Sequence, residues 1–344
     1  EEAKKKGCIA CIVDKDIDKL NKAKALYPNV KCIINPMVAI KDKTVNAIVI
    51  VLPVNKHYKY AKVALENNKH VLIEKPATDS YKKLKELVTI AKKRKLLFMV
   101  DYTFLYTSAV QKIKEMLDNN VIGNILFIEA QRLNLGIFRN DVSVMWDLSV
   151  HDISIIQYLL NKMPKYVSAT GMYCINSKIM DLSHITLKYS KKQICNISSS
   201  WLFPFKNKKM VIAGSKKTII YDDIEPTEKI KVYDKGYNVH YSNTEREKIL
   251  VDYRIGDIYI PKLSQEEALY KVCNEFLNSI ITKKEPLTNG DFALKDNILY
   301  VVCDVHPFGN GILENIPNIQ KVYSMKIDGL QHQSCAQGEK AKSR

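Results

Sequence analysis

Apolar runs and helical patterns alternate along the first hundred residues of the chain. Short apolar runs at 8–13, 47–52, 71–73 and 96–100 predict strands, and amphipathic stretches at 17–27, 57–67 and 81–93 predict helices between them. Strands separated by helices of this length are typical of βαβ units, whose strands lie parallel in one sheet. We therefore expect half of a Rossmann-like, doubly wound nucleotide-binding domain over residues 1–102.

The pattern changes after Thr103. A helix at 110–118, an apolar run at 125–130 and a helix that starts near Trp146 are followed by short β-type runs separated by turns. These runs lie at 166–173, 185–189, 193–201, 209–213, 218–221 and 229–232, and helical patterns at 266–281 and 292–302 follow them. This order predicts an α+β domain over residues 103–325, with a mostly antiparallel sheet and helices on one face. The polar, patternless residues 326–344 predict a disordered tail.

We expect the first βα unit of the nucleotide-binding domain to be missing from this sequence. Such domains open with a strand, a glycine-rich turn and a helix whose N-terminus holds a pyrophosphate. Here residues 1–7 lead directly into the run that corresponds to the second strand. A sheet without its middle strand exposes unpaired backbone groups. We therefore expect this chain to bind NAD weakly and to be poorly soluble, and an upstream extension to restore both properties.

The composition is typical of a globular protein with two domains. The 344 residues are 46% hydrophobic and 26% charged, and neither a membrane-length apolar run nor a signal peptide is evident. We therefore expect a cytoplasmic protein that has no membrane partner.

Eight cysteines are scattered through predicted elements, as expected for reduced thiols. The pair Cys8 and Cys11 has a metal-like spacing but no second Cys/His pair, so we expect no metal site.

The chain is basic, with 53 Lys and Arg residues against 37 Asp and Glu residues and a net charge of +16. The lysines are spread along helix faces and do not alternate with aromatic residues, which is typical of solvated surfaces. The excess also suits an enzyme whose substrate and cofactor carry phosphates. We therefore expect a small-molecule substrate and no nucleic-acid partner.

Asp14 follows the predicted strand at 9–13. In dinucleotide-binding folds an acidic residue at this place accepts hydrogen bonds from the adenosine ribose hydroxyls. A carboxylate there repels a 2′-phosphate, so the residue favours NAD over NADP. The alternative is that Asp14 is a solvated turn residue or a cap for the helix that starts near Ile17.

Two further strand ends carry candidate cofactor-binding residues. The loop after the strand at 47–52 suits adenine and ribose, although Asn55 alternatively caps the next helix. The segment His70–Pro76 delivers a Glu-Lys-Pro tripeptide at a strand end, where ligands bind in open α/β sheets. The expected cofactor-binding residues are Asp14, Leu52, Pro53, Asn55, His57, Glu74 and Lys75.

Asp147 and His151 form a second candidate pair. If this segment is helical, the spacing of four residues places both side chains on one face. A carboxylate beside an imidazole orients the ring and raises its basicity, which suits general acid/base catalysis on an alcohol. The alternative is structural, with Asp147 as a helix cap and His151 as a semi-buried core residue.

The ordered set of motifs resembles the glucose-fructose oxidoreductase/inositol dehydrogenase (Gfo/Idh/MocA) family over about residues 8–304. The resemblance rests first on Glu74-Lys75-Pro76 and on the later Asp-x-x-x-His segment. Within the family, the chain is similar to the branch that oxidises nucleotide-activated sugars. The segments that carry this second similarity are 130–136, 146–154, 200–202, 213–217, 221–226 and 286–290.

The resemblance implies roles for individual residues. Lys75 would contact the reacting hydroxyl and the nicotinamide ribose, and Asp147 and His151 would complete the proton-transfer site. Substrate contacts are expected from Arg132, Asn134, Tyr102 and Trp146. Asp101 and Tyr102 depart from the glycine and histidine that the family pattern leads us to expect.

The sequence thus predicts an NAD-dependent oxidoreductase. We expect it to oxidise a ring hydroxyl, C3 of a UDP-N-acetylaminosugar, to a ketone. The alternatives are a free-polyol or simple-sugar dehydrogenase of the same family, and a catalytically silent binding protein that retains the fold. The resemblance also implies a homo-oligomer that forms through the sheet of the second domain.

Overall fold

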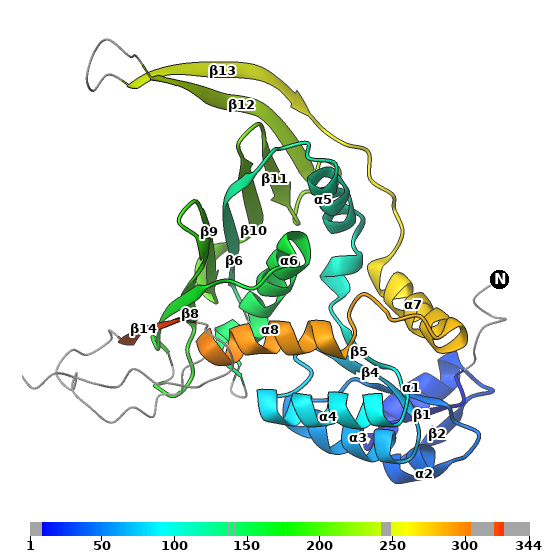
Figure 1. Ribbon diagram of the computed structural model, residues 1–344. Helices are drawn as coiled ribbons and strands as arrows, with labels where there is room; N and C mark the ends of the chain where they lie inside the picture. Colours follow the sequence, from blue (N-terminus) through cyan, green and yellow to red (C-terminus); the bar gives the residue numbers. More distant parts are fainter. Residues whose placement is uncertain are drawn as a thin grey trace, which may run out of the picture. The chain divides into compact units, whose positions relative to one another are not determined.

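A computed structural model describes residues 9–136, 138–139, 142–175, 177–241, 249–303 and 320–326. At 237–241, 249–252, 298–303 and 320–326 it describes the backbone alone. The chain divides into two compact units (Figure 1). The first comprises residues 1–106 and 266–298, and the second comprises residues 107–265 and 299–344.

The first unit contains two parallel sheets flanked by helices. Its strands are β1 (Cys11–Val13), β2 (Lys31–Ile33), β3 (Ala47–Ile50), β4 (His70–Glu74) and β5 (Phe98–Asp101). The helices between them are α1 (Ile17–Leu26), α2 (Pro36–Lys41), α3 (Val54–Glu66) and α4 (Tyr81–Lys93). This arrangement confirms the predicted Rossmann-like βαβ organisation. The sequence pattern missed β2 and α2, which are too short to show a clear period.

The parallel strands form one sheet of β1 and β2 and another of β3, β4 and β5. Among the described residues no strand joins these two sheets, and Val49 on β3 is exposed. The expectation of a further strand in this domain stays a prediction.

The core of the first unit lies between β4 and the helices α3 and α4. The two helices contact each other. Val71, Leu72 and Ile73 of β4 are buried, as expected for a strand covered on both faces. Burial of each such side chain contributes about 1.5–3 kcal/mol. The apolar centre of β4 therefore anchors the strand whose polar carboxyl end carries Glu74 and Lys75.

The domain boundary differs from the one that the sequence suggested. Helix α7 (Ala268–Thr282) and most of α8 (Gly290–Cys303) group with the first unit rather than with the second. The backbone N–H of Val100 on β5 donates to the Thr288 carbonyl, and the Tyr106 hydroxyl donates to Glu275 on α7. Such contacts join segments far apart in sequence, so local hydrophobic periodicity cannot reveal them.

The second unit is built on a nine-stranded sheet, which confirms the predicted α+β domain (Figure 1). The strand order is β13-β12-β11-β10-β6-β9-β8-β7-β14, and β6 and β9 form its parallel pair. The strands are β6 (Ile125–Leu135), β7 (Tyr166–Met172), β8 (Leu182–Ser190), β9 (Gln193–Ser200), β10 (Leu202–Gly214), β11 (Thr218–Asp222), β12 (Ile230–Tyr241), β13 (Ile249–Tyr259) and β14 (Gln320–Lys326). Helices α5 (Ser108–Asp118) and α6 (Val150–Leu160) pack together.

The helix expected near Trp146 begins differently from its prediction. Met145–Ser149 forms a π-helical turn, η3, and the regular helix α6 starts only at Val150. Turns of this kind are frequent at functional sites.

The structure bears in part on the expectations for the cysteines, for metal sites and membrane helices, and for the C-terminal tail. Cys11, Cys32, Cys174, Cys195 and Cys273 are free thiols, whereas the side chains of Cys8, Cys303 and Cys335 lie outside the described residues. In the described ranges no cluster of acidic, histidine or cysteine side chains has metal-binding geometry, and no helix is both long and apolar enough to cross a bilayer. The predicted tail lies outside the described residues after Lys326.

Candidate functional site

Asp14 lies directly after β1, and its side chain is about one-third exposed. Its Oδ1 accepts the backbone N–H of Asp16 at 2.9 Å, and Lys19 Nζ lies 4.0 Å from Oδ2. The N-cap of α1 is Asp16 rather than Asp14, since the Asp16 side chain accepts from Asp18 and Lys19. The carboxylate of Asp14 is therefore held at a strand end and remains accessible.

The loop after β3 leads directly into α3. Leu52, Pro53 and Asn55 are exposed there, and Pro53 is the N-cap residue of α3. The alternative that Asn55 caps this helix is therefore wrong, because Asn55 already lies inside its first turn. An uncapped helix N-terminus presents free backbone N–H groups and a positive dipole end, which suits a phosphate or a ribose hydroxyl.

Two carboxylates lie beside Lys75 at the carboxyl ends of β4 and β5. Glu74 pairs in register with Asp101, and the Glu74 carboxylate accepts the backbone N–H of Lys75 at 3.0 Å. Burial and the nearby Asp101 raise the pKa of Glu74. Burial also raises the pKa of Asp101, although Thr103, which donates to it at 2.6 Å, and the charge of Lys75 oppose the effect.

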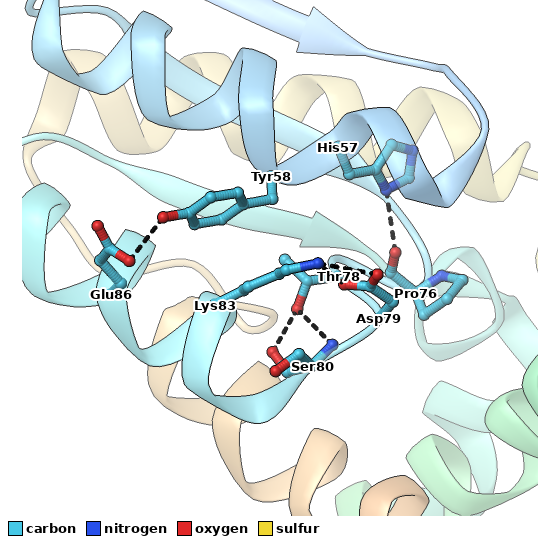
Figure 2. Close-up of polar contacts among 8 residues, drawn as sticks. All are labelled: His57, Tyr58, Pro76, Thr78, Asp79, Ser80, Lys83 and Glu86. Atoms are coloured by element: carbon cyan, nitrogen blue, oxygen red, sulfur yellow. Dashed lines mark hydrogen bonds and ion pairs between the residues drawn. The ribbon is translucent and has the colours of Figure 1, made fainter.

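His57 lies within the first turns of α3 and is buried (Figure 2). Its Nδ1 lies 3.0 Å from the Pro76 carbonyl oxygen, and its Nε2 lies 2.6 Å from the Leu52 carbonyl oxygen. Both ring nitrogens therefore face backbone of this chain. The cofactor-binding role expected for His57 stays a prediction.

Tyr102, a predicted substrate contact, is buried in the first unit. Its ring packs edge-on against Phe292 of α8, with the ring centroids 5.5 Å apart. Burial raises the pKa of Tyr102 well above its usual value, and the hydrogen-bonded carboxyl of Asp296 adds to the effect. Burial likewise raises the pKa of Asp296. These contacts give Tyr102 a packing role at the junction of β5 and α8.

In the second unit, Arg132 on β6 forms a bidentate ion pair with Asp152 on α6. Arg132 Nε and Nη2 donate to the two Asp152 carboxylate oxygens at 2.9 Å each, and both side chains are only 4% exposed. Burial alone would lower the pKa of Arg132, but the Asp152 carboxylate raises it. The pair anchors the start of α6, which also carries His151, onto the sheet.

Asp147 lies in the π-helical turn, one turn before His151. Its Oδ2 accepts from Trp201 Nε1 at 3.2 Å, and its Oδ1 lies 3.4 Å from Arg139 Nη1. The π-turn replaces the regular helix that the pairing argument assumed. The N-cap of this turn is Val144, so the alternative of Asp147 as a helix cap is wrong.

Asn134 and Trp146 are half-buried. Asn134 lies two residues after Arg132 on β6. Because side chains alternate between the two faces of a sheet, both residues lie on one face. This is the face covered by α6, since Arg132 bonds Asp152 there. Trp146 belongs to the π-helical turn beside Asp147. The predicted residues of the second unit thus gather on one face, around η3 and the start of α6.

Several residues of these clusters were not singled out for a function by the sequence. Thr103 and Trp201 hold the carboxylates of Asp101 and Asp147, and Arg139 pairs with Asp147. Asp152 directly follows His151, and this adjacency in the sequence could have pointed to Asp152. Thr103 lies two residues after Asp101, whereas Trp201 lies 54 residues after Asp147, so no local pattern links Trp201 to its partner.

The side chains of the first unit fit a dinucleotide. Asp14 supplies an accessible carboxylate for ribose hydroxyls, and α3 supplies free N–H groups beside exposed Leu52 and Pro53. Lys75 supplies an amine at the next strand end. Of the groups that a dinucleotide-binding fold supplies, Asp14 corresponds to the acidic residue for the ribose hydroxyls.

Comparison with known proteins identifies the class of fold. Residues 1–102 match the profile described as an oxidoreductase family with an NAD-binding Rossmann fold, and residues 110–220 match the GFO/IDH/MocA C-terminal domain. Together these matches span more than half of the chain. The chain belongs to the Gfo/Idh/MocA family of oxidoreductases.

Individual relatives are distant. The chain is 34% identical over 119 residues to an oxidoreductase of Schizosaccharomyces pombe, which corresponds to 35% of this chain and 32% of that protein. It is 23% identical over 274 residues to UDP-N-acetylglucosamine 3-dehydrogenase of Acidithiobacillus ferrooxidans, over 79% of this chain and 82% of the relative. A solved structure of the enzyme of that name from the same organism has a TM-score of 0.69 at 21% identity, and the match covers 86% of this chain and 88% of that one.

The structural match shows the shared fold. The chain spans about a third of the S. pombe relative and 60% of a Streptococcus pneumoniae oxidoreductase.

Proposed function

We propose that this protein is an NAD-dependent oxidoreductase that oxidises a ring hydroxyl of a nucleotide-linked sugar to a ketone. The observation that carries the proposal is the placement of Lys75 at the carboxyl end of β4, beside the carboxylates of Glu74 and Asp101. A lysine flanked by two partly desolvated carboxylates is suited to proton transfer at a ligand site. Asp14 lies after β1 of the same unit and favours NAD.

Each group has a defined task in this proposal. Asp14 binds the adenosine ribose, and the exposed Leu52 and Pro53 line the adenine side. When bound, NAD supplies the two-electron acceptor for the oxidation. The protein provides orientation and proton management.

The hydroxyl proton passes to Lys75 or to His151. Trp201 and Arg139 orient the Asp147 carboxylate, and Asp147 supports the imidazole of His151, the residue directly before Asp152.

We propose a UDP-N-acetylaminosugar, oxidised at C3, as the substrate class. The name of the A. ferrooxidans relative supports this choice. The net charge of +16 suits a substrate that carries a diphosphate. A free polyol or simple sugar is the competing substrate class.

The test is a panel of UDP-sugars, free hexoses and inositol, with NADH formation followed by absorbance. We expect turnover with a UDP-N-acetylaminosugar and competitive inhibition by UDP. Turnover of inositol or free sugars without inhibition by UDP would establish the competing class. NAD binding without turnover of any compound, under conditions where the protein is folded, would instead indicate a silent binding protein.

We further propose that the open face of the sheet in the second unit pairs with a second copy of the chain. Phe127 on β6 and Ile194 on β9 are register partners, and both remain exposed on that face. Larger contiguous apolar patches on a surface mark interaction sites, and these two side chains would lie within such a contact. Sedimentation equilibrium of the parent and of Phe127→Glu measures the effect, and we expect the substitution to weaken association.

A further inference from the structure

A buried histidine connects the two loops that follow β3 and β4. His57 is 1% exposed, and its two ring nitrogens face the carbonyl oxygens of Leu52 and Pro76 at 2.6 and 3.0 Å. Leu52 follows β3, and Pro76 immediately follows Lys75 after β4. Figure 2 shows the ring of His57 directed from α3 toward the Pro76 carbonyl. A single side chain therefore connects the adenine-side loop to the backbone next to Lys75.

The chemistry of this contact is unusual because both partners are acceptors. A carbonyl oxygen only accepts hydrogen bonds, and a neutral imidazole has one N–H to donate. Both contacts are complete hydrogen bonds only when the ring is an imidazolium. In the neutral ring one nitrogen lone pair faces a carbonyl oxygen, so one of the two loops is held less firmly.

The surroundings of the ring set its protonation. Burial lowers the pKa of His57, while the carbonyls of Pro76, Leu52 and Ala77 and the charge of Asp79 oppose that effect. Asp79 is itself paired with Lys83 of α4 at 2.9 Å.

The other charged groups near this contact are engaged with one another. The Tyr58 hydroxyl of α3 donates to Glu86 of α4 at 2.6 Å, and Lys62 lies 2.7 Å from the same carboxylate. On the strand side, the Glu74 carboxylate accepts the Lys75 backbone N–H. These pairs hold α3 against α4, and the imidazole itself faces backbone groups, with the carbonyls of Leu52 and Pro76 at 2.6 and 3.0 Å.

We propose that His57 is a positioning residue, which lies between the Leu52 and Pro76 carbonyls, donates to one of them when neutral and to both when protonated, and so fixes the backbone from which Lys75 reaches its substrate. The inference rests on the proposed function of Lys75. In this proposal His57 acts through the position of Lys75. Its replacement is expected to displace Lys75 without removing it.

The kinetic test uses His57→Phe, which keeps a ring and removes both nitrogens, and His57→Gln, which keeps one amide donor. We expect His57→Phe to lower kcat by up to about a hundredfold, the typical cost of a misplacement of about 1 Å. His57→Gln should recover part of this loss. His70→Phe is the matched control, because His70 lies at the opposite end of β4 and accepts the backbone N–H of Leu97 at 2.9 Å. We expect that control to lower stability and to leave kcat unchanged.

A double-mutant cycle with Lys75→Met separates positioning from general destabilisation. If His57 acts through Lys75, His57→Phe should lower the rate in the parent and have little further effect in the Lys75→Met background. Equal losses in both backgrounds would overturn the proposal. Full activity of Lys75→Met alone would instead refute the proposed function of the lysine.

A second measurement needs neither cofactor nor turnover. In the full chain with labelled histidine and lysine, NMR follows the His57 ring nitrogens and the Lys75 amide across pH. We expect the Lys75 amide shift to follow the ionisation of His57 and to lose this dependence in His57→Gln. A Lys75 amide that ignores the His57 titration would overturn the inference, whatever the outcome of the activity assays.

Discussion

Glu74 and Asp101 occupy directly paired positions at the carboxyl ends of the adjacent parallel strands β4 and β5. Two partly buried carboxylates at this spacing repel each other, and the pKa of Glu74 is raised by burial and by Asp101. Lys75 lies beside both and favours their charged forms. By reciprocity, the carboxylates stabilise the ammonium form of Lys75.

Asp101→Asn should therefore move the ionisation of Lys75 in the pH-rate profile to lower pH. The substitution removes a negative charge and keeps the shape of the side chain. Glu74 on β4 and Glu267 and Cys273 near α7 are the other ionisable groups of this cluster. The pH dependence of kcat/KM measures the change. Asp291→Asn is the control, because Asp291 is an exposed partner of Lys92.

The same variant should also change the pH dependence of folding stability. Burial raises the pKa of Asp101, so the folded protein keeps this proton at pH values where the unfolded carboxyl, with a pKa of about 3.9, has lost it. The folded state thus binds more protons, and stability falls as the pH rises through this interval. Urea denaturation at several pH values should show a shallower slope for Asp101→Asn; an unchanged slope would contradict the shift.

Lys75→Met should abolish most turnover and retain the fold. A general acid/base group contributes about a hundred- to ten-thousand-fold in rate. Steady-state NADH formation measures the loss, and circular dichroism verifies folding. Lys85→Met, at an exposed position on α4, serves as the matched control. Near-normal turnover by Lys75→Met would remove the lysine from the proposed site.

His151→Ala should lower the rate and remove an ionisation near neutral pH from the rate profile. An imidazole with a pKa of about 6.5 is the side chain suited to that range. The exposed His184 on β8, which bonds Ser198, provides the control substitution His184→Ala. An identical pH-rate profile for the parent and His151→Ala would leave His151 with a structural role.

Asp14→Asn should weaken the preference for NAD. The amide retains the hydrogen bond to the Asp16 backbone, whereas the charge that repels a 2′-phosphate is lost. The ratio of kcat/KM for NAD to that for NADP measures the preference. Asp18→Asn, at an exposed position of α1, should leave this ratio unchanged. A preference of the parent for NADP would contradict the role of Asp14.

Arg132→Met should destabilise the second unit by about 3–5 kcal/mol, because it leaves the buried Asp152 carboxylate unpaired. The double variant Arg132→Met/Asp152→Leu should recover much of that loss, since an apolar pair removes the desolvation penalty. Lys83→Met, which breaks the more exposed pair with Asp79, should cost about 1 kcal/mol or less. Chemical denaturation measures all three. If the recovered double variant still shows a raised KM, Arg132 also serves the substrate as the sequence predicted.

The sequence by itself determined the fold class of both units and the family, although its pattern missed β2, α2, β13 and β14. Helix α4 was predicted at its observed bounds, because its apolar residues recur at helical spacing and form a buried face. The position of Lys75 at a strand end also followed from local pattern, since an apolar run and the tripeptide after it are contiguous in sequence.

Only the tertiary structure decided which side chains meet. The joining of α7 to the first unit, the pairing of Glu74 with Asp101 and the bonding of Arg132 to Asp152 all link residues at least twenty positions apart. The burial of His57 and Tyr102 and their partners Pro76 and Phe292 also came only from the tertiary structure. Periodicity records which face of an element is apolar, whereas burial and hydrogen-bond partners depend on the elements packed against it.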